Sequence, residues 1–147
     1  MARVTVIDDS PEFLLLMDDL LSGLGHQMTG FEAVEASIES IVRSKPDLLI
    51  VDLRLRDGPA RISGWELVVL ARSHMQLGSI PVILCTADMW ELKQRARVLE
   101  QIKGVHVRTK PFVVDEMCDL IQHLLAGAPV PAYHTPSAAL TNRAATG

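Results

Sequence analysis

Hydrophobic and polar residues follow two alternating patterns along most of the chain. Five short runs of aliphatic and β-branched residues are typical of strands, and each precedes a segment with the apolar spacing of a helix. Two of these runs, LLIV and VILC, are apolar at every position, as strands buried on both faces are. The alternation predicts an α/β fold with a parallel sheet covered by helices on both faces. The predicted strands are Arg3–Ile7, Gln27–Phe31, Leu48–Val51, Ile80–Cys85 and Val105–Arg108.

The segment after the first strand has the clearest helical signature. Ser10 is a candidate N-cap, Pro11 suits the first helical position, and Gly25 offers a C-terminal stop. Leu14 and Leu15 fall outside the apolar stripe that this helix is expected to bury. The stripe comprises Phe13, Leu16, Met17, Leu20, Leu21 and Leu24.

Four further helices are expected. Pro46 ends the second one, whose apolar stripe comprises Val34, Ile38, Ile41 and Val42. The other three are predicted at Trp65–Met75, Met89–Ile102 and Val114–Leu125.

Length and composition favour one domain followed by a tail. The chain has 147 residues, of which 48% are hydrophobic, and a net charge of -4. This suffices for a single core and provides no basic field for direct contact with nucleic acid. Residues 1–126 are the predicted domain. Residues 127–147 are rich in Ala, Pro, Thr and Ser, so we expect a flexible C-terminal tail.

The sequence also bears on compartment and redox state. No apolar run approaches the roughly 20 residues that span a bilayer, and the N-terminus lacks the layout of a signal peptide. We therefore expect a cytoplasmic protein without membrane insertion. Cys85 and Cys118 lie in apolar patterns without CxxC spacing, which favours buried free thiols over a metal site.

Acidic, hydroxyl and basic side chains stand at or just beyond the predicted strand ends. Asp8 and Asp9 follow the first strand, and the ends of the third, fourth and fifth strands lead to Asp52, Thr86 and Lys110. In an open parallel sheet these ends share one edge, where doubly wound folds bind ligands. A single aspartate at a strand end is usually a turn or cap residue. Together in register, the five residues predict a common site.

The chemistry of this set points to phosphate and a divalent cation. Three crowded carboxylates would raise one another's pKa unless a cation lay among them. Magnesium, Mg²⁺, fits because it takes few carboxylates together with waters and a phosphate oxygen. Asp52 is the candidate nucleophile toward phosphorus and would form an acyl phosphate. Lys110 and Thr86 would contact phosphate oxygens as a point charge and a hydroxyl donor.

These residues resemble a known family. The DD at Asp8–Asp9, the D after LLIV, the TA at Thr86–Ala87 and the KPF at Lys110–Phe112 look like the receiver domain of two-component response regulators. The resemblance implies a flavodoxin-like, doubly wound sheet of five strands in the order 2-1-3-4-5, with five helices. It also implies a cis Lys110–Pro111 bond and a set of residue roles. These are Asp52 as phosphoacceptor, Thr86 as switch hydroxyl, Lys110 as phosphate sensor, and Asp8, Asp9, Asp52 and the backbone carbonyl of Arg54 as Mg²⁺ ligands.

By this resemblance the chain would be a stand-alone phosphorylatable switch. A sensor histidine kinase or a histidine phosphotransfer protein would supply the phosphoryl group to Asp52. Output would be contact with a downstream protein target or phosphate relay. The only chemistry would be self-phosphorylation and autodephosphorylation, so the chain is not expected to be an enzyme acting on other substrates.

Two segments depart from the family pattern. Arg56 stands where a proline is usual and Gly64 comes late, so the loop after Asp52 is longer than usual. This loop contains Arg54, Arg56 and Arg61. These arginines would either retain phosphate or dock a partner, or they are solvated residues of a surface loop. Val107 replaces the usual aromatic residue, so the usual aromatic relay cannot operate in that form. The adjacent His106 is expected on the other side of the strand.

Two other functions remain open. A receiver-fold binding module that needs no phosphate would suit Val107 and the altered loop, although the acids, Thr86 and Lys110 argue against it. A phosphohydrolase of small phosphoesters fits less well, because no DxDxT arrangement or second general acid follows Asp52.

Overall fold

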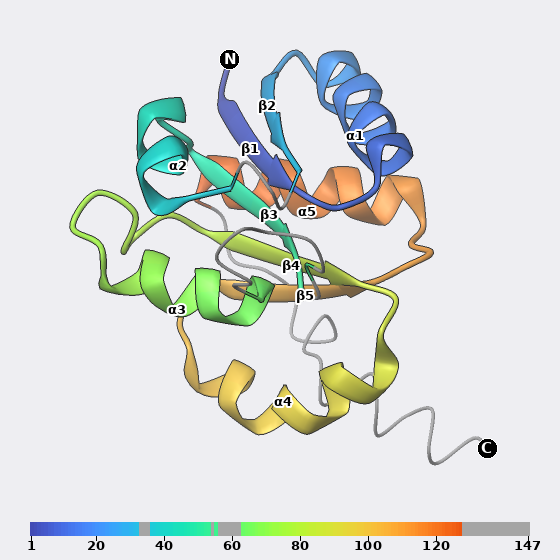
Figure 1. Cartoon of the computed structure of the whole chain (residues 1–147). Coiled ribbons are helices and arrows are strands. Elements are labelled where there is room, and N and C mark those ends of the chain that lie inside the picture. Colours follow the sequence, from blue (N-terminus) through green and yellow to red (C-terminus); the bar gives the residue numbers. More distant parts are fainter. Residues whose placement is uncertain (33–35, 54, 56–62, 128–147) are drawn as a thin grey trace.

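Strands and helices alternate along the described part of the chain (Figure 1). The computed structural model describes residues 1–32, 36–53, 55 and 63–127. The strands are β1 (Arg3–Ile7), β2 (Gln27–Phe31), β3 (Leu48–Asp52), β4 (Val82–Thr86) and β5 (Val105–Thr109). The helices are α1 (Pro11–Gly23), α2 (Ile38–Ser44), α3 (Gly64–Ser73), α4 (Met89–Gln101) and α5 (Val114–Ala126). The strands pair in parallel in the order β2-β1-β3-β4-β5, which confirms the predicted fold class.

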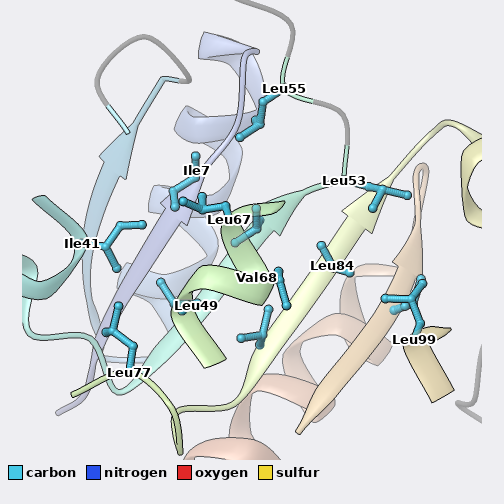
Figure 2. Close-up of a cluster of buried hydrophobic side chains, with 14 of the residues drawn as sticks. Ile7, Ile41, Leu49, Leu53, Leu55, Leu67, Val68, Leu77, Leu84 and Leu99 are labelled. Atoms are coloured by element: carbon cyan, nitrogen blue, oxygen red, sulfur yellow. The ribbon is translucent and has the colours of Figure 1, made fainter. Parts of the chain in front are cut away.

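Helices cover both faces of the sheet, and each face has its own core. Leu48 and Ile50 of β3 pack with α1 and α5, whereas Leu49 and Val51 pack with α2, α3 and α4. Figure 2 shows the second of these cores, in which Leu49 of β3 and Val68 of α3 are among the labelled side chains. All four β3 residues are almost completely buried, as the continuous apolar run predicts. Burial of each such side chain contributes about 1.5–3 kcal/mol, so the two cores are a main source of stability.

The fourth strand begins later than predicted. Ile80 donates its backbone N–H to Leu77 in a turn, at 3.2 Å, and Pro81 has no N–H to donate to a sheet. The strand therefore begins at Val82 and extends to Thr86. The third and fifth strands likewise extend one residue beyond the predicted ends, to Asp52 and Thr109.

The buried stripe of α1 is rotated relative to the prediction. Leu16 is 47% exposed, whereas Leu14 packs against the core beside Met17 and Leu21. Leu14 is three residues before Met17 and Met17 is four before Leu21, so the three share one helical face. Leu16 lies off that face. Leu15 is exposed, as predicted.

The helix boundaries are close to those predicted. Ser10 caps α1 by accepting a hydrogen bond from the backbone of Phe13 at 3.2 Å. The third helix ends at Ser73 rather than Met75, because the chain turns at His74, whose carbonyl accepts the backbone N–H groups of Leu77 and Gly78. Val34, placed in the second predicted helix, lies outside the described residues.

Three remaining expectations concern the ends and the thiols. Helix α5 ends at Ala126, and residues 128–147 of the predicted tail are outside the described part, so the division into domain and tail stays a prediction. No helix of residues 1–32, 36–53 and 63–127 is long and apolar enough to cross a membrane. Both cysteines are free, and burial raises the pKa of Cys85 to about 12, whereas Cys118 is only partly buried.

Candidate functional site

Three of the predicted site residues meet at the carboxyl edge of the sheet. The Nζ atom of Lys110 lies 2.5 Å from Oδ2 of Asp8 and 3.4 Å from Oδ2 of Asp52. Asp8 directly follows β1, Asp52 ends the neighbouring β3, and Lys110 directly follows β5. The ammonium therefore pairs closely with one carboxylate and approaches a second one across β4.

Asp8 is the most deeply buried of these three charged groups. Its side chain is 2% exposed, compared with 15% for Asp52 and 20% for Lys110. Its Oδ1 atom accepts the backbone N–H of Ser10 at 2.9 Å. Burying a charge is costly unless it is paired and hydrogen-bonded. Lys110 and Ser10 together offset that cost for Asp8.

Opposing effects act on the pKa of Lys110. Partial burial lowers this pKa, while the hydrogen bond to Asp8 and the charges of Asp52 and Asp8 raise it, and the net direction is upward. Lys110 is therefore a cation throughout the neutral range.

The Lys110–Pro111 peptide bond is cis, as the resemblance implies.

Aromatic residues border this lysine. The Nζ atom of Lys110 lies 4.0 Å from the centroid of the Phe13 ring. Phe112 meets the same ring edge-on, with centroids 6.2 Å apart and an interplanar angle of 87°. The sequence pattern predicts Phe13 only as part of the apolar stripe of the first helix. Its position three residues after the N-cap places it in the first turn, but no sequence signal pairs it with Lys110.

Thr86 ends β4 and is linked to the start of α4. Its Oγ1 atom accepts the backbone N–H of Asp88 at 2.9 Å, which leaves the hydroxyl proton for another acceptor. Asp88 in turn caps α4 by accepting the backbone N–H of Glu91 at 2.9 Å. The carbonyl oxygen of Thr86 accepts the backbone N–H of Lys110 at 2.8 Å. The hydroxyl predicted to act as a switch thus contacts the residue that caps α4.

The chain returns to the backbone of Asp52 at Gly64. Gly64 donates its N–H to the carbonyl of Leu53 at 3.1 Å. A Cβ atom on Gly64 would lie 1.7 Å from the carbonyl oxygen of Asp52, so no side chain fits at this position. The late glycine noted in the sequence is therefore required by close backbone contact. Arg54, Arg56 and Arg61 lie outside the described residues.

Val107 is a buried part of the core on the α3 and α4 side of the sheet. It is 6% exposed and lies in register with Leu84 of β4. His106 is in register with Ile83, a residue of the opposite core, as the alternation of a strand predicts. The position singled out in the sequence is thus filled by a small aliphatic side chain that offers no ring to swing.

The acids of the site form a partial donor set for a divalent cation. Within the described ranges, no three carboxylate, imidazole or thiol side chains are grouped to hold a metal by themselves. Mg²⁺ is usually bound by one or two carboxylates and keeps several waters. Asp8 and Asp52 share Lys110 as a partner, and the half-buried Asp9 adjoins Asp8. These hard oxygen donors fit Mg²⁺ in its hydrated form.

Comparisons with known proteins agree on one family. The family model of the response regulator receiver domain matches residues 4–122. Hybrid signal transduction histidine kinase D of Dictyostelium discoideum is 33% identical over 122 residues, covering 83% of this chain and 7% of that protein. The chain thus spans a small part of that relative. Protein PilH of Pseudomonas aeruginosa is 25% identical over 133 residues, covering 86% of this chain and 100% of PilH.

A solved structure is similar in fold. It is the receiver domain of a sensor histidine kinase from Pseudomonas aeruginosa, described with a magnesium ion coordinated in its active site cleft. The TM-score is 0.70 at 20% identity, and the match covers 85% of this chain and 98% of that one.

Proposed function

Since the chain belongs to the response regulator receiver domains of two-component signalling, we propose that it is a phosphorylatable switch with Asp52 as the phosphoacceptor. The observation that supports this most is the position of Lys110, whose ammonium lies near the carboxylates of Asp8 and Asp52 at the carboxyl edge of the sheet. Asp52 is the more exposed of the two carboxylates and makes the longer contact with Lys110. It is therefore the better placed to react with an incoming phosphoryl group.

The proposed donor is a phosphohistidine on a sensor histidine kinase or a histidine phosphotransfer protein. A carboxylate oxygen of Asp52 attacks the phosphorus atom, and the new P–O bond forms as the P–N bond breaks. The imidazole nitrogen leaves and takes up a proton. The product is an acyl phosphate. Water later attacks its phosphorus, which releases inorganic phosphate and restores the Asp52 carboxylate.

Lys110 and Thr86 would stabilise the transferred group. Lys110 exchanges part of its contact with Asp8 for a phosphoryl oxygen, in a charge-assisted hydrogen bond. The hydroxyl of Thr86 donates its proton to another oxygen of the group. Both contacts would stabilise the negative charge on the phosphoryl oxygens, because the donors are already oriented toward it, unlike the water molecules of bulk solvent.

The acids would hold the cation that this chemistry needs. Asp8, Asp9, Asp52 and the backbone carbonyl of Arg54 are the proposed ligands of Mg²⁺, which when bound neutralises charge on the transferred phosphoryl group. In the free protein, Oδ2 of Asp8 already pairs with Lys110. Lys110 therefore competes for this oxygen, and we expect weak magnesium binding before phosphorylation.

Output is proposed to occur through contact with a downstream protein or relay of the phosphoryl group. The link from Thr86 to Asp88 supports the first route, because movement of the hydroxyl toward Asp52 would cost Asp88 a hydrogen bond at the start of α4. The surface around that turn would then differ between the two states.

Intact mass spectrometry tests this proposal. Incubation with acetyl phosphate and Mg²⁺ should add one phosphoryl group to the parent protein and none to Asp52→Asn. Asp119→Asn, a change at an exposed acid of α5, should behave as the parent. Removal of Mg²⁺ by a chelator should abolish the gain. Full phosphorylation of Asp52→Asn would refute the assignment.

A phosphate-independent binding module is the second candidate, favoured by the buried Val107. The same measurement separates the two functions. A parent protein that gains no mass from acetyl phosphate with Mg²⁺, while it remains folded, would favour the binding module.

A further inference from the structure

A cyclic network of contacts links the start of α1 to Lys110. Oδ1 of Asp8 accepts the backbone N–H of Ser10 at 2.9 Å, and Oγ of Ser10 accepts the backbone N–H of Phe13 at 3.2 Å. The Phe13 ring lies 4.0 Å from Nζ of Lys110, which donates to Oδ2 of Asp8. The network thus begins and ends at Asp8. The N-cap of α1 therefore fixes the backbone of Phe13 relative to the acid that Lys110 binds.

Among the described residues, the ammonium meets three partners, as many as it has protons. A lysine ammonium carries three donors, and Lys110 meets the carboxylates of Asp8 and Asp52 and the face of Phe13. An aromatic face attracts a cation through its quadrupole, and the attraction is stronger where water is partly excluded. The Lys110 side chain is 20% exposed, so this condition is met.

The orientation of the Phe13 ring is set by its neighbours. Phe112 meets Phe13 edge-on at 87°, a favoured geometry for two aromatic rings. Both rings also pack against the core between the sheet and helices α1 and α5. The ring is thus held from the core side, and its face is presented to Lys110.

We propose that Phe13 is a positioning residue of the phosphorylation site, which holds the Lys110 ammonium in place to receive the phosphoryl group. The effect on phosphorylation rests on the proposed function, whereas the contact between Phe13 and Lys110 does not. Without the ring, the four-carbon stem of Lys110 samples other rotamers, and its ammonium spends less time near Asp52. Phosphorylation of Asp52 then slows, although both charged partners of Lys110 are intact.

Two variants and two measurements test the proposal. Phe13→Leu removes the ring and keeps an apolar side chain, whereas Phe13→Tyr keeps the ring. Nuclear magnetic resonance relaxation of ¹³C-labelled lysine reads the mobility of the Lys110 side chain at Cε, which does not depend on a ring current; Lys110→Arg identifies the signal. Mass spectrometry with acetyl phosphate and Mg²⁺ gives the phosphorylation rate. Phe31→Leu is the matched control, because this ring packs in the opposite core.

The expected result is a restrained Lys110 side chain in the parent, Phe13→Tyr and Phe31→Leu, and a more mobile one in Phe13→Leu. The phosphorylation rate of Phe13→Leu should fall about fivefold, the factor that corresponds to about 1 kcal/mol of cation–π attraction. Unchanged Lys110 mobility in Phe13→Leu would overturn the proposal, as would increased mobility with an unchanged rate. A parent that takes up no phosphoryl group, together with increased Lys110 mobility in Phe13→Leu, would refute the proposed function and leave the placement of Lys110 by Phe13 supported.

Discussion

The contact between Gly64 and Asp52 shows how one residue constrains the site. The chain that leaves β3 comes back to the backbone of Asp52 at Gly64, the first residue of α3. Only hydrogen fits on the α-carbon there. The glycine therefore fixes where the chain must return to β3.

Replacement of this glycine should be costly. In Gly64→Ala the new methyl group would meet the Asp52 carbonyl at 1.7 Å, and the backbone of one of the two residues must move. We expect a loss of about 1–3 kcal/mol in the free energy of unfolding, typical of overpacking, although alanine is the better helix former by about 1 kcal/mol. Urea unfolding gives the value.

Gly23→Ala is the matched control for that change. Gly23 is the last residue of α1, and a Cβ atom there would meet nothing within 4 Å. This variant should be as stable as the parent or more so, because alanine restricts the unfolded chain. Equal stability changes in the two variants would contradict the close-contact explanation for Gly64.

At the scale of elements, Arg72 connects the end of α3 to two other segments. Its guanidinium donates to the carbonyls of Ile80, Gly78 and Leu77, at 2.7, 3.2 and 3.4 Å. It also donates to Lys103 and Gly104 in the turn before β5, at 3.1 and 3.0 Å. Partial burial lowers the pKa of Arg72. One side chain thus satisfies carbonyl groups that flank the starts of β4 and β5.

Removal of this side chain should destabilise the fold without touching the site. Hydrogen bonds to a charged donor contribute about 1.5–3 kcal/mol, and solvent screening reduces this at a half-buried residue. We expect Arg72→Ala to lower the free energy of unfolding by about 2 kcal/mol. Arg72→Lys should recover little, since an ammonium lacks the planar fork.

Arg97→Ala, at an exposed position of α4, should change stability by less than about 0.5 kcal/mol. If Arg72→Ala were as mild, or if Arg72→Lys restored full stability, the bridging role of the guanidinium would be wrong.

The sequence predicted elements better than it predicted contacts. The five strands and the convergence of Asp8, Asp52 and Lys110 follow from apolar runs and from the rule that parallel strand ends share an edge. The order of the strands follows only from the resemblance to receiver domains. Strand β4 begins two residues later than predicted because Pro81 has no donor, an effect that periodicity does not register, and β3, β4 and β5 each extend one residue beyond their predicted ends. Contacts across the sheet, such as Phe13 with Lys110, have no local signature.

At the scale of the whole molecule, the signal should travel through the loops rather than through β5. Thr86 contacts Asp88 at the start of α4, whereas Val107 is a packed aliphatic residue of the core. We expect beryllofluoride, a mimic of the acyl phosphate, to increase hydrogen-exchange protection after Asp52 and Thr86. Residues around Val107 and α5 should change little.

Hydrogen exchange of Asp52→Asn with beryllofluoride is the control, and it should match the unliganded parent. New protection confined to β5 and α5, with none after β3 or β4, would show that the signal takes the usual route despite Val107.

The central claim is that Asp52 is the residue that bears the acyl phosphate, and chemical trapping tests it most directly. Borohydride reduces an aspartyl phosphate to homoserine, which is stable to digestion and peptide mass spectrometry. After incubation with acetyl phosphate and Mg²⁺, we predict homoserine at position 52 and intact aspartate at Asp8 and Asp9. Homoserine at Asp8 or Asp9, with Asp52 unmodified, would contradict the account.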